Sequence, residues 1–108
     1  MRRSELSITI VSPRRMRELN KKYRGKDKAT DVLSFPLWTK RELSTQAKKH
    51  GILDLGDIFI NSRDAKKNFL FLTTHGFLHL LGFDHERSHR EKKLMFALQD
   101  EIITIVRN

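Results

Sequence analysis

Residues 75 to 85 read HGFLHLLGFDH and hold three of the five histidines of the chain in an otherwise almost wholly apolar run. From about residue 65 to residue 81, apolar side chains recur on all sides of a helix, which predicts a buried central helix. Gly82 supplies a left-handed residue to end that helix, and Phe83 stands where the hydrophobic contact of such a cap belongs. Imidazoles on a buried helix need partners, because burying an unpaired polar group is costly.

Strand patterns precede this helix. Alternating or β-branched apolar residues predict three strands, at residues 6–12, 30–38 and 55–61. Pro36 suggests that the second strand lies partly at a sheet edge. The polar segment 40–51 favours a surface loop, with a partial helix as the alternative.

Two further helices are expected. Ser12 and Pro13 form a helix start, since serine caps a helix and proline suits its first position, and Gly25 ends it. Its predicted buried stripe consists of Met16, Leu19 and Tyr23. Ser88 and Glu91 match a capping box for the last helix. Its predicted apolar face consists of Leu94, Leu98, Ile102 and Ile105.

Strands and helices do not alternate regularly in this pattern, which favours the α+β class. We expect a small mixed sheet covered by helices, with the buried helix presenting its histidines in a zincin-like layout. A chain of 108 residues without repeat or linker fits one domain, residues 1–108. With no cysteine and only a short, interrupted apolar segment near its start, the chain is expected to be cytoplasmic and to have no membrane partner.

The chain is strongly basic, with 22 lysines and arginines against 13 acidic residues and a net charge of +9. Such a charge favours a polyanionic partner, most simply nucleic acid, although a solvated surface explains it equally well. Residues 14–28 contain eight basic side chains and hold phosphates if their polar face lines a cleft. In this segment Tyr23 either stacks on a base or packs in the core, and its spacing favours the core.

The three histidines have the spacing of a metal site. Because His75 and His79 are four residues apart, they lie on one face of a helix, and the turn after Gly82 can bring His85 toward them. Three neutral imidazoles with a fourth position left to water make a catalytic zinc site. Core histidines satisfied by backbone or carboxylates are the alternative, but a metal offsets the burial of all three rings.

The neighbouring residues refine this site. In zinc peptidases a glutamate follows the first histidine as general base, whereas here Gly76 does, so the standard peptidase mechanism is disfavoured. Asp84 and Glu86 are the nearest carboxylates and either orient a histidine or move a proton. His89 is a spare ligand candidate, with a solvated position favoured.

Taken with LNKKYRGKDKATDVLSFP at residues 19–36 and LGDIFI at residues 55–60, the histidine stretch resembles the YbeY family of endoribonucleases. The resemblance implies a zinc-dependent enzyme specific for single-stranded RNA, acting in 16S rRNA 3′-end maturation and ribosome quality control. It implies His75, His79 and His85 as metal ligands and Arg24 as the functional arginine. The implied partners are rRNA and the ribosome or its small subunit, with no DNA expected.

We therefore predict that Arg24 and His75 take part in catalysis, with Thr30 and Ser34 near the substrate. Compared with the family, we expect the chain to lack an N-terminal helix and strand-flanking residues, to be shorter by a helix between Asp57 and His75, and to have a longer loop after Pro36. Two rival functions stay open, a zinc-dependent amide hydrolase and an RNA- or ribosome-binding module with a structural metal. A fourth protein ligand would distinguish the structural metal, because it closes the position that water needs.

Overall fold

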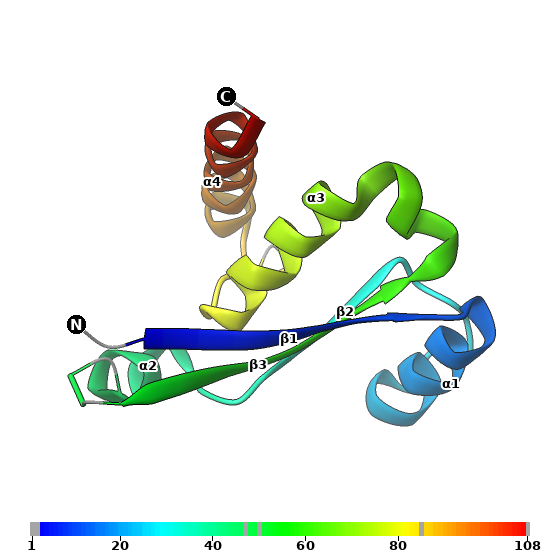
Figure 1. Ribbon diagram of the computed structural model, residues 1–108, viewed down its shortest axis with the longest axis horizontal. Coiled ribbons are helices and arrows are strands. Elements are labelled where there is room, and N and C mark those ends of the chain that lie inside the picture. The colour runs from blue at the N-terminus through cyan, green and yellow to red at the C-terminus, as the bar shows by residue number, and fades with distance from the viewer. Residues whose placement is uncertain (1–2, 47, 50, 85, 108) are drawn as a thin grey trace.

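The computed structural model describes residues 3–46, 48–49, 51–84 and 86–107, which form three strands and four helices (Figure 1). In chain order these are β1 (Arg3–Val11), α1 (Pro13–Arg24), β2 (Val32–Pro36), α2 (Lys40–Gln46), β3 (Ile52–Asn61), α3 (Ser62–Leu80) and α4 (His89–Arg107). The three predicted strands are all present, and segment 40–51 contains the short helix α2. Among the described residues, none of the helices has the length and apolar content needed to cross a bilayer.

The sheet is small and mixed, as predicted. Its strand order is β1-β3-β2, with β1 parallel and β2 antiparallel to β3. The expected irregular order of elements was wrong, because strands and helices alternate as far as α3. The α+β class nevertheless holds, since the antiparallel β2 makes the sheet mixed. β2 is an edge strand, so one of its sides has no neighbouring strand and is open to a cleft.

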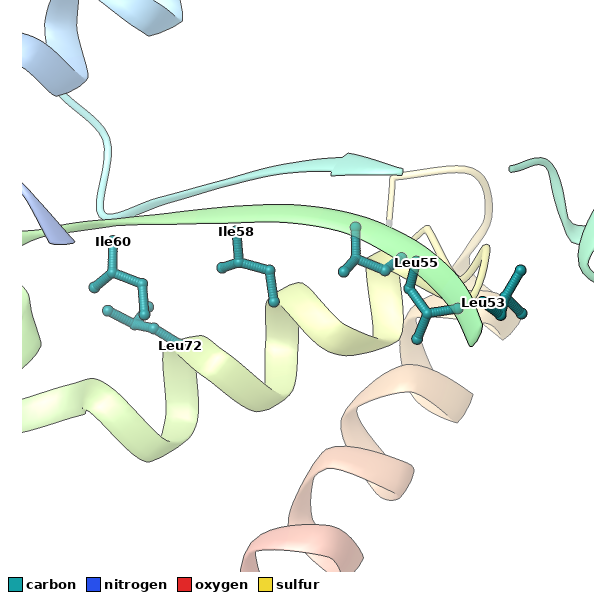
Figure 2. Packing of buried hydrophobic residues seen from close by; sticks show 6 residues of the cluster. Leu53, Leu55, Ile58, Ile60 and Leu72 are labelled. Atoms are coloured by element: carbon teal, nitrogen blue, oxygen red, sulfur yellow. The ribbon is translucent and has the colours of Figure 1, made fainter. Parts of the chain in front are cut away.

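Helix α3 packs on one face of the sheet, where Leu72 lies next to Ile60 of β3 in the same buried cluster as Ile58 (Figure 2). The cap at its end forms as predicted. The N–H groups of Gly82 and Phe83 donate to carbonyls of the last turn, at 3.0 and 3.1 Å, and Gly82 has a φ of 98°.

The first half of α3 departs from the predicted burial on all sides. Asn68 has non-helical backbone angles and marks a kink, and Phe69 and Phe71 beyond it are exposed. The helix is therefore amphipathic there, because only its sheet-facing stripe meets β3. The apolar residues that follow serve the core, as Leu78 and Leu80 are buried.

Helix α1 covers the opposite face of the sheet (Figure 1). Met16 and Leu19 pack there against Leu33 of β2, whose side chain points away from its neighbour Ser34 because strand residues alternate. The predicted start and end are confirmed, since the Ser12 side chain accepts from a first-turn N–H and Gly25 has a φ of 70°. Tyr23 was wrongly assigned to the buried stripe.

Helix α4 packs against α3 through a stripe that only partly matches the predicted one, in which Leu98 and Ile102 are half-buried. Met95 and Gln99 are fully buried, whereas Leu94 is 50% exposed; the side chain of Ile105 lies outside the described part. The capping box is half formed. Ser88 accepts the N–H of Glu91, but the Glu91 carboxylate accepts the N–H of Asp84 instead.

Candidate functional site

His75 and His79 stand one turn apart on α3, and their rings converge. Their Nε2 atoms are 3.2 Å apart, and their ring centroids are 4.7 Å apart. Two imidazole ligands of a tetrahedral zinc ion, each about 2.0–2.1 Å from the metal, place their nitrogens roughly 3.3 Å apart. The geometry of this pair therefore fits two ligands of one ion, and the metal role of the pair stays a prediction.

The third predicted ligand, His85, lies outside the described residues. Among the residues that the structure does describe, no three histidine or carboxylate side chains gather to hold a metal. Asp84 and Glu86 line the same cleft as the histidine pair, and Asp84 also accepts the N–H of Glu86. His89 begins α4 and is exposed, which agrees with the solvated position that the sequence favoured.

Gln99 of α4 is a site residue that the sequence reasoning missed. Its Oε1 atom lies 3.2 Å from the Nδ1 atom of His75, and its side chain is fully buried. When Nδ1 carries the hydrogen and donates it to this oxygen, the lone pair of His75 is on Nε2, the atom that faces His79. Because the predicted apolar face of α4 did not include Met95 or Gln99, no sequence signal pointed to this residue.

The packing around position 76 leaves no room for a glutamate after His75. A Cβ atom at this position would lie 2.9 Å from Ile58 Cγ2 and 3.0 Å from Ser34 Oγ. The helix backbone therefore sits directly on the sheet, and a longer side chain has no room between them. The general base of a zinc peptidase cannot stand there without moving α3.

A cleft of about 800 Å³ opens beside the histidine pair. It lies along β2 and is lined by residues from the end of α1, the following loop, β2, α3 and the turn after α3. Arg24 lines it together with His75 and His79, so the structure brings these predicted residues to one cavity. Thr30 and Ser34 line it as well, as expected.

Two buried asparagines hold the loop between α1 and β2 in place. Asn20 donates from Nδ2 to the carbonyl of Lys28 at 2.9 Å, and Asn61 donates from Nδ2 to the carbonyl of Thr30 at 3.0 Å. Because Asn61 also caps α3 through Arg63 N–H, it ties this loop to the histidine-bearing helix. A single asparagine forms no recognisable sequence pattern, so the roles of these two were not predicted.

Only the C-terminal part of the basic segment, residues 14–28, lines the cleft. The predicted phosphate-binding role therefore applies to that part alone. Of the basic residues in this segment, Arg24, Lys26 and Lys28 line the cleft, and Lys40 and Arg87 from other parts of the chain line it as well. Arg17 forms a paired contact with Asp27, at 2.8 and 3.2 Å. This hydrogen bond lowers the pKa of Asp27 below its ordinary value and fastens the loop to α1.

A family profile described as endoribonuclease YbeY matches residues 1–107. This chain belongs to the YbeY family. A relative from Persephonella marina, named endoribonuclease YbeY, is 43% identical in an alignment that covers 96% of this chain and 71% of the relative. A Sulfurihydrogenibium relative of the same name is 44% identical, over 91% of this chain and 67% of its own.

The fold also resembles a solution structure from Thermotoga maritima, with a TM-score of 0.52 and 31% sequence identity. That match covers 89% of this chain and 63% of the other. The chain thus spans about two thirds of the length of the YbeY proteins and of the structure that it matches. The resemblance inferred from the histidine stretch is confirmed at the level of family and fold.

Proposed function

We propose that this chain is a metal-dependent endoribonuclease that cuts single-stranded RNA in the cleft along β2. The observation that supports this most is that Arg24 lines the same cleft as His75 and His79. Hydrolysis of a phosphodiester needs a cation near the developing negative charge and a means of activating water. Membership in a family whose curated relatives are named endoribonucleases points to the same reaction.

Zinc is the proposed metal, with His75, His79 and His85 as its three protein ligands. The 3.2 Å between the Nε2 atoms of the first two supports this assignment. When bound, the ion would polarise a phosphoryl oxygen and lower the pKa of a water molecule in its fourth position.

The chain's own side chains orient both the metal ligands and the substrate. Gln99 holds His75 by its Nδ1 atom, so that Nε2 faces His79. The planar guanidinium of Arg24 suits two-point contact with the scissile phosphate, whose charge grows in the transition state. Lys26 and Lys28, on the loop that Asn20 fixes, bind flanking phosphates. Arg24 and His75 are thus the proposed catalytic residues.

Two rival functions are disfavoured. An amide hydrolase of the zinc peptidase type lacks its general base, since Gly76 packs against Ser34 and Ile58. A module with a purely structural metal needs a fourth protein ligand, and His89, the spare ligand candidate, is exposed at the start of α4. The number of protein ligands to the metal, three or four, separates the enzyme from the module with a structural metal. His85 is one of the three predicted ligands in that count.

The cellular setting follows from the family and from the charge of +9. We propose that the natural substrate is rRNA at the 3′ end of the 16S species, met on the ribosome or its small subunit in the cytoplasm. Ribosome quality control is part of the same proposal. A strongly basic chain favours association with nucleic acid.

The test is chelator-sensitive cleavage by the purified chain. Equal amounts of a single-stranded rRNA fragment, its annealed duplex and the matching DNA are incubated with protein as purified, after chelation, and after zinc is restored. We expect cleavage of the single strand alone, its loss on chelation and its return with zinc. Cleavage that ignores the chelator, or that is equal in a His75→Ala preparation, would reject the proposal.

A further inference from the structure

Tyr23 has no place in the core, although its spacing with Met16 and Leu19 predicted one. Its side chain is 56% exposed at the end of α1. It borders a second hollow, here called the side pocket, with a volume of about 470 Å³. The side pocket is lined by Tyr23, Arg24, Lys26, Ser34 and Phe35. We propose that it binds one nucleobase of the RNA substrate, which stacks on the Tyr23 ring; this inference rests on the proposed function.

An aromatic support fixes the Tyr23 ring. Tyr23 meets Phe35 edge to face, with centroids 5.1 Å apart at 70°, and Phe35 meets Phe59 in the same way at 5.6 Å. Phe35 and Phe59 pack against the buried cluster beneath α1. The ring is therefore braced from the core, so ordering it for stacking costs little entropy. The ammonium of the exposed Lys22 lies over the ring, 5.2 Å from its centroid, and a stacked base would displace it or use the other face.

The surroundings of the side pocket suit a nucleotide better than an apolar ligand. Three of its lining residues, Arg24, Lys26 and Ser34, also line the cleft, so the two hollows meet at the edge of β2. A strand whose phosphate contacts Arg24 in the cleft can place a neighbouring base beside Tyr23. Aromatic stacking next to a basic groove is how proteins bind single strands without reading their sequence.

This arrangement also predicts strand selectivity. A base can enter the side pocket only when it is free to leave a helical stack, which a duplex prevents without an unpairing cost. The side pocket thus makes single-stranded RNA the better ligand through binding, independently of the metal. Because every base has a flat π face, we expect little preference among the four bases.

The experiment is a coupling cycle between the protein and the RNA. A short single-stranded RNA is prepared with one abasic nucleotide placed at each position in turn, and its affinity is measured for the parent, Tyr23→Ala and Tyr23→Phe. RNA integrity is checked on a gel after each titration. Phe69→Ala, which removes an exposed aromatic that lines neither hollow, is the matched control, and circular dichroism checks each fold.

For the parent, we expect one abasic position, next to the cleavage site, to weaken binding about tenfold, the effect of one base–aromatic stack. Tyr23→Ala should lose the same amount on intact RNA and nothing more when that base is missing, while Tyr23→Phe and Phe69→Ala match the parent. Additive losses at every position, or a Tyr23→Ala variant that binds like the parent, would overturn the side-pocket assignment while leaving the proposed function standing. A parent chain without affinity for single-stranded RNA would overturn both.

Discussion

The Nδ1 atom of His75 on α3 lies 3.2 Å from the Oε1 atom of Gln99 on α4. The contact joins a cleft histidine to a side chain with no solvent exposure. Its consequence is chemical, because an acceptor at Nδ1 leaves the lone pair of the ring on Nε2, opposite His79.

Replacing Gln99 should therefore impair metal binding more than folding. Gln99→Leu removes the acceptor and should weaken zinc affinity by about 10- to 100-fold, whereas Gln99→Glu keeps an acceptor and should retain it. Competition with a chromophoric chelator measures the affinity, and Thr104→Ala on an exposed turn of α4 is the control. If Gln99→Leu binds zinc as tightly as the parent, the contact does not orient a ligand.

Gly76→Ala should destabilise the fold, because its new methyl group meets Ile58 and Ser34 at 2.9 and 3.0 Å. Overpacking of this kind costs about 1–3 kcal/mol. Urea unfolding followed by circular dichroism gives the difference, with Lys66→Ala on an exposed turn of α3 as the control. A Gly76→Ala variant as stable as the parent would mean that α3 moves freely on the sheet.

Neutralising two of the cleft lysines should reduce the salt dependence of RNA binding. For single strands each lost phosphate contact lowers the slope of log affinity against log salt by about 0.7, so Lys26→Gln with Lys28→Gln should lower it by about 1.4. Lys66→Gln with Lys67→Gln changes the net charge equally but outside the cleft. Equal slopes for the two double variants would show that the cleft lysines act only through overall charge.

The Arg17–Asp27 pair predicts a pH effect. The hydrogen bond from Arg17 lowers the folded-state pKa of Asp27, so the pair adds stability above the unfolded value of about 4 and loses it as the pH falls through the lower folded value. Asp27→Asn should melt slightly below the parent at pH 7, and the two melting temperatures should converge below about pH 4. A gap that is constant down to pH 2 would assign the effect to something other than this charge.

Local patterns predicted much of this fold because they depend on near neighbours in the chain. Ser12 with Pro13 and Gly82 with Phe83 set helix ends through contacts within one turn, and the structure has both. The spacing of His75 and His79 likewise follows from helix geometry alone. These features required no knowledge of how the elements pack.

The sequence-based predictions were wrong where tertiary packing determines which side chains are buried. Tyr23 has the spacing of a buried residue, but its position in the folded chain leaves it 56% exposed, with its ring centroid 5.1 Å from that of Phe35. Leu94 was expected on the buried face of α4 and is 50% exposed, whereas Gln99, for which no position was predicted, is fully buried, because the packing of α4 against α3 selects the buried stripe. The pairing of Gln99 with His75, 24 residues apart, depends on that same packing.

The central claim is that Arg24 acts on the phosphate that the histidine site cleaves, and single-turnover cleavage of a single-stranded rRNA fragment by Arg24→Ala tests it most directly. Metal content, melting temperature and RNA affinity are measured on the same samples, beside Arg24→Lys and His79→Ala. We predict that Arg24→Ala keeps its metal, fold and most RNA affinity but cleaves about 100- to 1,000-fold more slowly. Arg24→Lys should recover little of this rate, since a point charge cannot replace the planar fork, and His79→Ala should lose metal and cleavage together. Cleavage by Arg24→Ala at the parental rate, with the metal in place, would contradict the account.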